Sequence, residues 1–401
     1  MSRAFAPLRP PGSRPARVVR PQIEPGRRVV AVSDVHGNLP FLKGVLEKVR
    51  FIPDDVLIIV GDLLEKGTES LATLRYVLEL QKTHTVYTLC GNCDYIDRMF
   101  FDGGDDAFRL QMADWPDAPE GGRSQELWHI FHVLRFWRER SVLIQMAAEA
   151  GLPFPGSVDD IPALAAALLE RFPEETGFLL NLPTILEAGN FLFVHGGVPR
   201  EDRLEELEAY PCMKNDDFLG QGHSFRKWVV AGHWPVTLYD PRIQRSAPLI
   251  DDDRHIASID GGCVLKMDGQ LNALIIPDIG GDKLLYTWYD GLPTVTALDG
   301  QEASPDPLNI RWSDSVVEVL REEGDCALIR HPSSGRELWL PRDFISVWRD
   351  GKTHTEDATD YRLPVSPGDT LSLVRETRRG CLVKKDGITG WYHGRIKYNE
   401  D

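Results

Sequence analysis

Short apolar runs that alternate with helical patterns constrain the fold of this chain more than any other feature. Three runs stand in the first hundred residues, at Val29–Val32, Val56–Val60 and Thr85–Cys90. Apolar residues recur at helical spacing between them, over about residues 39–49 and 71–78. Strands that are apolar on both faces need cover on both faces, so the pattern predicts an α/β fold with a parallel or mostly parallel sheet.

Polar residues follow each run, with a glycine within five positions of its end, and the same holds for two later runs at residues 191–194 and 228–231. The carboxyl ends of parallel strands meet at one edge of a sheet, where ligands bind. Carboxylate, amide and imidazole groups together suit a site for two metal ions. The candidate ligands, in chain order, are Asp34, His36, Asp62, Asn92, His195 and His233.

The rest of the chain divides into segments that differ in composition and in expected secondary structure. Residues 1–28 carry seven arginines and one acid, with six prolines and little to pack, which indicates an extended basic arm. Two long helical patterns, at 127–140 and 161–171, predict a helical insertion, and 256–265 with 271–276 suggests a closing hairpin. We expect four segments: an arm at 1–27, a catalytic domain at 28–276 with the insertion at about 100–185, a connector at 277–309, and a small all-β domain resembling an SH3-like barrel at 310–401.

Composition excludes several classes of protein. The net charge of −16 argues against strong binding to a nucleic-acid backbone, because such proteins need a basic face. No stretch approaches the roughly 18 apolar residues of a membrane span. Six cysteines in 401 residues are too few for a disulfide framework, so we expect a reducing, cytoplasmic setting.

As an ordered set, the five strand-end motifs resemble those of the calcineurin-like metallophosphoesterases, in the branch of phosphoprotein phosphatases and bacterial diadenosine tetraphosphatases. The resemblance covers about residues 28–276 and implies a β-sandwich flanked by helices. It also implies two divalent metal ions, expected to be manganese, with iron or zinc as alternatives, and attack on phosphorus by a metal-bridging hydroxide. By position, it assigns Asp34 and His36 to the first metal, Asp62 to both metals, and Asn92, His195 and His233 to the second; it gives Asp260 a structural role.

The chain departs from that branch at two places. Cys93, followed by Asp94, stands where the branch has a histidine near the leaving group, and Lys66 replaces a phosphate-binding arginine. We therefore take Asp62, Cys93, Asp94 and Lys66 as the catalytic candidates. A thiol beside two cations is a poor proton donor, so we expect activity on aryl phosphates or nucleotide anhydrides to exceed activity on phosphoserine.

Three functions stay open at this point. Hydrolysis of a phosphate monoester, on protein or small molecule, comes first, favoured by Pro235 where phosphodiesterase relatives have a second histidine. Hydrolysis of a phosphodiester or dinucleoside polyphosphate is the alternative. A catalytically weak scaffold, whose C-terminal domain recruits a partner, is the third.

A few more side chains are weaker candidates, for each of which a structural role is the simpler interpretation. Cys90 and Cys93 form a Cys-x-x-Cys pair that could act in redox chemistry, with Cys90 expected in the core. The remaining candidates, as substitute acids, phosphate-binding groups or a cation site, are His129, His132, His223, Arg135, Arg138, Arg140, Arg200 and Asp251–Asp253.

Overall fold

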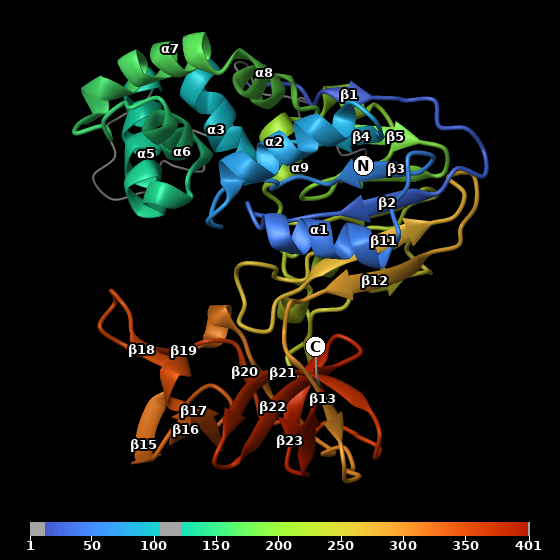
Figure 1. Cartoon of the computed structure of the whole chain (residues 1–401), viewed down its shortest axis with the longest axis vertical. Coiled ribbons are helices and arrows are strands. Elements are labelled where there is room, and N and C mark those ends of the chain that lie inside the picture. The colour runs from blue at the N-terminus through green and yellow to red at the C-terminus, as the bar shows by residue number, and fades with distance from the viewer. Residues whose placement is uncertain (1–12, 105–121, 400–401) are drawn as a thin grey trace, which may run out of the picture. The chain divides into compact units, whose positions relative to one another are not determined.

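The computed structural model describes residues 13–104 and 122–399 (Figure 1). Residues 1–12 of the expected arm and 105–121 of the expected insertion lie outside the described part. The chain forms two compact units. The first contains Met1–Trp234, Pro248–Val264 and Leu271–Tyr289, and the second contains Pro235–Ala247, Leu265–Gln270 and Asp290–Asp401.

Two sheets form the centre of the first unit. The five-stranded sheet has the order β12 (Leu285–Tyr289), β11 (Leu271–Ile276), β2 (Val29–Val32), β3 (Val56–Ile59) and β4 (Thr85–Thr88). The six-stranded sheet has the order β1 (Val18–Val19), β5 (Ile185–Ala188), β6 (Phe191–Val194), β7 (Trp228–Ala231), β10 (Ile256–Ser258) and β9 (Leu249–Asp251). Strands β2, β3 and β4 are parallel, as the sequence predicts, whereas β11 runs antiparallel to β2.

Alternate residues of each apolar strand enter different cores. Val29 and Ala31 of β2 belong to the cluster shared with Phe193 of β6, between the two sheets. Val30 and Val32 belong to the cluster that contains the helices. Because both faces of β2 are covered, every side chain of the strand is fully buried and must be apolar.

Helices cover the outer face of the five-stranded sheet. Asn38 caps the N-terminus of helix α1 (Leu39–Lys48), where its side chain accepts a hydrogen bond from the Phe41 N–H. The helix lies against β11 and β12 (Figure 1). Helix α2 (Ser70–Gln81) lies against β4. None of the described helices is both long enough and apolar enough to cross a membrane.

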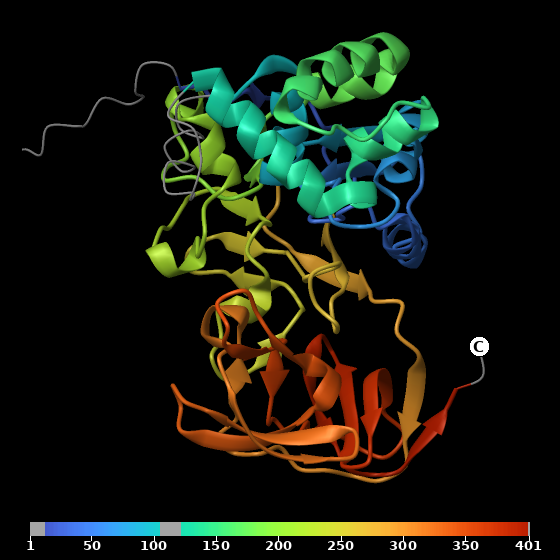
Figure 2. The same cartoon turned by 90° about the vertical axis from the view of Figure 1, so that its left-hand side faces the viewer.

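The expected helical insertion forms a second group of helices, drawn in teal and green in both views (Figures 1 and 2). Helices α6 and α7 contact each other, as do α7 and α8, and α3 contacts α5, α7 and α8. The elements are α3 (Asn92–Asp102), α5 (Gly122–Trp137), η1 (Arg138–Arg140), α6 (Val142–Glu149), η2 (Val158–Asp160), α7 (Ile161–Arg171) and α8 (Pro173–Asn181).

Short helical elements follow strands β6 and β7 in the chain. They are η3 (Leu204–Glu206), α9 (Ala209–Met213) and η4 (Leu219–Gln221) in the first unit, and η5 (Val236–Leu238) in the second.

Part of the expected arm is built into the fold. Strand β1 pairs in parallel with β5, and Ala16 is buried. The arginines of this segment meet acids of the same unit: Arg14 contacts Asp102 at 3.0 Å, and Arg20 contacts Glu187 at 2.7 Å. The basic segment therefore lies on the acidic surface of its own chain rather than in solvent, over its described residues.

The expected closing hairpin is wrong. Strand β10 pairs with β7 and β9 in one sheet, whereas β11 pairs with β2 and β12 in the other. Ala257 and Leu274 both enter the core between the sheets, so these two apolar runs line that core from opposite layers. The hairpin partner of β11 is β12, which the sequence placed in the connector.

The second unit is all-β, but the described strands form no closed barrel, so the expected SH3-like barrel is not found. Its largest sheet has the order β24 (Ile396–Tyr398), β13 (Thr294–Ala297), β21 (Thr370–Thr377), β22 (Gly380–Lys385), β23 (Ile388–Tyr392) and β8 (Gln244–Arg245). Both β13 and β8 come from outside residues 310–401.

Smaller sheets complete the second unit. Three strands form one antiparallel sheet, and two pairs of short strands accompany it. They are β15 (Glu318–Glu323), β16 (Cys326–His331) and β17 (Arg336–Pro341), then β14 (Asn309–Ile310) with β20 (Ala358–Thr359), and β18 (Ile345–Val347) with β19 (Thr353–Thr355), beside η6 (Trp312–Asp314) and η7 (Arg342–Phe344).

Candidate metal centre

The strand ends of both sheets meet in the first unit. The polar residues that follow β2, β3 and β4 come from one sheet, and those that follow β6 and β7 come from the other. The side chains of Asp34, His36, Asp62 and His195 are 0–1% exposed, although all four are polar. Burial of this many polar groups is costly unless each has a partner or holds an ion.

Two groups of ligand atoms share one carboxylate. Asp34, Asp62 and His195 form one group, and His36, Asp62 and Cys93 form the other, with the ligand atoms of each group within 4.8 Å of one another. His195 Nε2 lies 3.4 Å from Asp62 Oδ1, and His36 Nε2 lies 3.8 Å from Asp62 Oδ2. Each oxygen of Asp62 therefore faces a different imidazole, which is the arrangement that a bridging carboxylate needs.

The imidazole rings are held from behind by backbone carbonyls. His195 Nδ1 lies 2.8 Å from the Val60 oxygen, and His36 Nδ1 lies 3.3 Å from the Leu64 oxygen. An N–H at Nδ1 leaves Nε2 as the free ligand atom, directed at the carboxylates. Asn92 Oδ1 lies 3.3 Å from His195 Nε2, so the amide joins the same cluster. This donor set fits two divalent cations that share Asp62.

His233 lies next to the cluster with a different set of contacts. Its backbone N–H donates to Asp34 Oδ2 at 3.0 Å, and its ring centroid is 5.3 Å from that of His195. Its Nε2 lies 2.8 Å from Asp216 Oδ1 and 3.2 Å from Lys214 Nζ. Sequence reasoning missed both of these neighbours, because they stand in a polar loop with no strand before them.

The backbone at the site is in the left-handed region. The φ angles are 57° at Asp34, 52° at His36, 48° at Asp62 and 66° at His233. Each such residue costs on the order of 1 kcal/mol or more and persists where the surroundings enforce it. Four of the six candidate ligands share this strain, which turns their side chains toward one point.

Two glycines make room for the carboxylates. A Cβ on Gly91 would collide with the side chain and backbone of Asp62, and a Cβ on Gly232 would collide with Asp34 and Ser33. The glycines beside the strand ends therefore permit close approach of neighbouring strand ends as well as a tight turn.

The two buried histidines titrate in opposite directions. Burial and the nearby Lys66 ammonium lower the pKa of His36 to about 3, so this ring is neutral, as a ligand must be. Burial opposes charge on His195 too, but the carboxylates of Asp62 and Asp34 outweigh it and raise the pKa of His195 to about 9. Without metal, the His195 imidazolium thus balances part of the negative charge of Asp62 and Asp34. Bound cations would balance this charge instead.

Lys66 reaches the cluster from the loop after β3. Its Nζ lies 3.2 Å from His36 Nε2 and 4.0 Å from Asp62 Oδ2. Burial disfavours its charge, but Cys93 and the surrounding carboxylates outweigh burial and raise the pKa of Lys66. Lys66 therefore keeps its proton and stands as a fixed positive charge.

Asp94 positions the strand-end loops. Its carboxylate is fully buried and accepts hydrogen bonds from the N–H groups of Gly91 at 2.9 Å, Leu64 at 3.2 Å and Leu63 at 3.4 Å. Burial and the neighbouring Asp62 raise the pKa of Asp94 to about 7. These contacts tie the loop after β3 to the loop after β4.

A buried acid pair that the sequence did not reveal lies behind this loop. Glu65 is fully buried and accepts a hydrogen bond from the Val142 N–H at 2.7 Å. Its side chain also lies beside Ser141 and the fully buried Asp97 of α3, and burial raises the pKa of both acids. Glu65 and Lys66 also have positive φ angles, of 71° and 64°.

Both thiols of the Cys-x-x-Cys pair are buried. The Cys93 N–H donates to Asp62 Oδ1 at 2.8 Å, and Sγ belongs to the group with His36 and Asp62. Burial, then the Asp62 carboxylate, raises the pKa of the Cys93 thiol well above its usual value. Cys90 enters the helix-side core, as expected.

The histidines considered as substitute proton donors, His129, His132 and His223, have other neighbours. Burial and the neighbouring His132 lower the pKa of His129 to about 4, so this ring is unprotonated near neutral pH. The His132 ring is tilted by 31° to that of Trp128, with centroids 4.0 Å apart, and His223 lies beside Phe218.

The candidate phosphate-binding and cation groups separate into two sets. Arg200 is held by its own loop, at the Asp202 carbonyl and at Glu206. Asp251 pairs with Arg254 at 2.6 Å. Arg135 and Arg138 line a pocket in the insertion.

Comparison with known proteins identifies the family. A family model described as calcineurin-like phosphoesterase matches residues 27–258, which contain all six candidate ligands. The chain therefore belongs to the calcineurin-like phosphoesterases.

Curated relatives share one description. A bis(5'-nucleosyl)-tetraphosphatase, symmetrical, of Photobacterium profundum is 25% identical over 286 residues, which is 67% of this chain and 79% of the relative. One of the same description from Pseudomonas putida (strain W619) is 46% identical over 65 residues, or 16% of this chain. In such shorter alignments the chain spans only about a quarter of the relative's length. The share is 22% for the relative from P. putida and 24% for the one from Thioalkalivibrio sulfidiphilus (strain HL-EbGR7).

Solved structures also match. A putative diadenosine tetraphosphatase aligns with a TM-score of 0.39 and 20% identity, over 69% of this chain and 100% of that one. A cold-active protein-tyrosine phosphatase of a Shewanella species aligns with a TM-score of 0.38 and 15% identity, over 70% and 82%.

Proposed function

We propose that this chain is a dinuclear metal-dependent phosphoesterase of the phosphatase type. The observation that carries the proposal is the shared position of Asp62 between two groups of buried ligand atoms. When bound, two divalent cations would lower the pKa of a water molecule and neutralise charge that develops on the phosphoryl oxygens. Manganese is our first choice of metal, because the carboxylate and amide oxygens suit it, and the imidazoles make iron and zinc the alternatives.

The chain's own residues supply binding and orientation. Lys66 and Lys214 place ammonium groups beside His36 and His233, at two sides of the cluster. Both can bind phosphoryl oxygens as point charges, without the two-pronged geometry of arginine. Asp94 keeps the loops of Asp62 and Asn92 in register through its three backbone contacts.

The substrate class follows from the weakness of Lys66 and Cys93 as proton donors, since the Asp94 carboxyl is engaged by three backbone N–H groups. Lys66 holds its proton strongly, and the thiol of Cys93 is a weak acid. Alkoxide leaving groups need a proton, whereas phosphoanhydride and aryl oxide leaving groups need it least. We therefore propose phosphoanhydrides of the dinucleoside polyphosphate type as the preferred substrates. The descriptions of the curated relatives support this choice.

A substrate panel tests this proposal in the presence of Mn²⁺. It compares diadenosine tetraphosphate, p-nitrophenyl phosphate, its bis ester and a phosphoserine peptide, for wild type and for Cys93→His. We expect the anhydride and aryl monoester to exceed the phosphopeptide, and Cys93→His to raise the phosphopeptide rate. Equal wild-type rates on all four, or no gain from the histidine, would contradict the reasoning.

Phosphate monoesters in general are the second candidate function. Pro235 replaces the second histidine expected of a phosphodiesterase, and it stands two residues after His233. Alkyl monoesters turned over as fast as the anhydride would favour this candidate.

The scaffold hypothesis makes a separate prediction. A chain that held no metal after incubation with Mn²⁺, measured by elemental analysis, and hydrolysed none of the four substrates would be a binding module. Asp62→Asn provides the matched control for both measurements, since it removes the shared ligand.

A further inference from the structure

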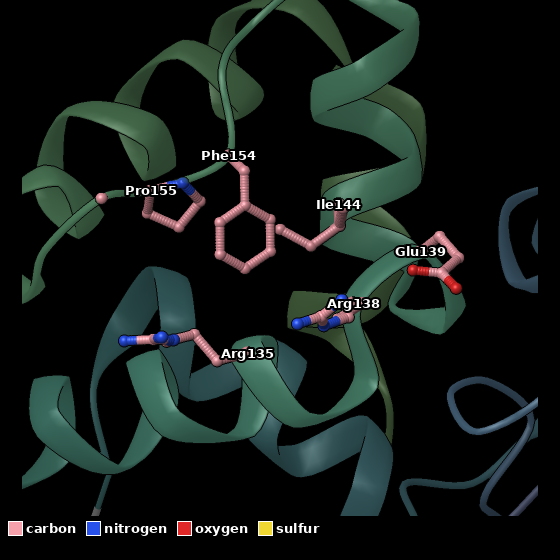
Figure 3. Close-up of a pocket in the computed structure, with 7 residues that line it drawn as sticks. Arg135, Arg138, Glu139, Ile144, Phe154 and Pro155 are labelled. Carbon is pink, nitrogen blue, oxygen red and sulfur yellow. The ribbon is translucent and has the colours of Figure 1, made fainter.

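A hollow in the helical insertion lies apart from the metal ligands. It opens between α5, η1, α6 and the loop before η2, and its volume is about 480 Å³ (Figure 3). We call it the insertion pocket. Its lining residues are Arg135, Arg138, Glu139, Ile144, Phe154, Pro155 and Gly156.

Two arginines give the pocket its charge. Arg135 lies in the last turn of α5, and Arg138 begins η1 directly after that helix. Neither forms an ion pair within the described part of the chain, and both residues are exposed. Figure 3 shows both guanidinium groups on the same side of the Phe154 ring, with Glu139 at the opposite end of the pocket from Arg135.

One guanidinium group has an aromatic neighbour. The Arg135 guanidinium lies 5.5 Å from the centroid of the Phe131 ring, within the range of a cation–π contact. Arg138 has a φ angle of 53°, so its backbone is in the left-handed region. A strained backbone of this kind persists where the surrounding structure enforces it.

The opposite wall is apolar and flat. The Phe154 side chain is 43% exposed, and its ring stands over the arginines between Pro155 and Ile144 (Figure 3). An exposed aromatic ring stacks on a planar base, and guanidinium groups bind phosphate oxygens in a two-pronged manner. A ligand that satisfies both walls therefore combines a planar heterocycle with at least two negative charges, as a nucleoside phosphate does.

The pocket is joined to the metal centre through short contacts. The Arg140 carbonyl accepts a hydrogen bond from Ser70 Oγ at 2.9 Å, and the Val142 N–H donates to Glu65. Glu65 directly precedes Lys66, which contacts His36. The three residues from Arg138 to Ser141 span at most about 11 Å, so a short stretch of backbone links the pocket lining to the buried contacts behind the catalytic loop.

We propose that the insertion pocket is a subsite for a nucleoside phosphate, which holds the part of a dinucleoside polyphosphate that does not react. The proposal rests on the proposed function and adds to it a specificity site on the insertion. Arg135 and Arg138 bind phosphate, Phe154 stacks on the base, and the Glu139 carboxylate limits affinity by repulsion.

The test compares a long and a short substrate. For Arg135→Ala/Arg138→Ala, we expect the KM for diadenosine tetraphosphate to rise about 10- to 100-fold, since each lost charge-assisted contact is worth about tenfold. The kinetics with p-nitrophenyl phosphate should not change, because this substrate is too small to reach both sites. Phe154→Ala should raise the dinucleotide KM, and Glu139→Gln should lower it. Arg203→Ala removes an exposed charge outside the pocket lining and should leave both substrates unaffected.

Two results would overturn the subsite: an unchanged dinucleotide KM in the double variant, or an equal loss on both substrates. Failure of the proposed function looks different, because wild type would then hydrolyse neither substrate. The pocket is still tested in that case by calorimetric titration with ADP in EDTA. We expect binding by wild type that the double variant weakens at least about tenfold, and equal binding by both would refute the site.

Discussion

Glu65→Gln should make the chain more stable at alkaline pH, although it alters a fully buried residue behind the metal centre. Burial is the largest cause that raises the pKa of Glu65, to about 8 from its usual 4.5. Glutamine has the same shape, can still accept the Val142 N–H, and offers Asp97 a donor that does not depend on pH. The substitution thus removes a titration and keeps the contacts.

The sign follows from proton linkage. Between pH 4.5 and 8 the unfolded chain has lost the proton of Glu65 while the folded chain keeps it, so the stability of wild type falls as pH rises. One pKa unit corresponds to about 1.4 kcal/mol, so the full shift gives an upper bound of about 5 kcal/mol. We expect the variant and wild type to be nearly equal at about pH 5, and the variant to be more stable by about 2–5 kcal/mol at about pH 8.5.

Urea unfolding followed by tryptophan fluorescence at several pH values measures this difference. The same saturating concentration of Mn²⁺ in every sample makes the linkage of metal binding common to both proteins. Glu79→Gln is the control, because Glu79 is exposed on α2 and pairs with Lys82. It should shift stability by a small amount that does not vary with pH. Parallel curves for wild type and Glu65→Gln across this pH range would refute a raised pKa of Glu65 in the folded chain.

Four further predictions concern the metal centre. Asp62→Asn should abolish binding of at least one metal, measured by elemental analysis, and lower the aryl phosphate rate by about 10³-fold or more, as expected when charge stabilisation worth several kcal/mol is lost. Gly91→Ala should weaken metal binding because its Cβ displaces the shared carboxylate, whereas Gly177→Ala, with open space around it, should not. Lys66→Met should raise the KM for p-nitrophenyl phosphate about 10-fold, and Lys66→Arg should restore it. An unchanged KM in Lys66→Met would mean that the ammonium only balances charge. Metal binding should release a proton from His195 and strengthen as pH rises toward about 9, seen as a buffer-dependent heat in calorimetry; heats that do not vary with the buffer would contradict this.

The sequence indicated the candidate metal ligands because local rules place polar residues at strand ends. An apolar run that is buried on both faces must end where the chain leaves the sheet, and the residue there sits at the functional edge. Asp62 and His195 are far apart in the chain, yet each is identified by the strand before it. The family match over residues 27–258 spans all of these motifs and shows the family to which they belong, whereas the role of each residue stays a prediction.

The second unit shows where such local rules stop. The turns at residues 367–374 and 387–392 correctly indicated strands, which became β21 and β23. Which strands complete their sheet depends on partners distant in sequence, such as β8 beside β23 and β13 beside β21. Short strands with one covered face pair with any suitable edge, so their sequence pattern does not select a closed barrel over an open sheet.

The amino-acid sequence by itself thus determined the α/β order of the first unit and the residues that stand at its strand ends, because burial on both faces of a strand imposes a pattern on neighbouring residues. Tertiary structure alone decided that Lys214 and Asp216 meet His233, that Glu65 meets Asp97, and that Arg135 and Arg138 face Phe154. These contacts join polar residues from separate loops and helices, and a polar residue on a loop carries no periodic signal of what it faces. Their identity depends on how the chain returns on itself, which only the packed cores of the folded unit fix.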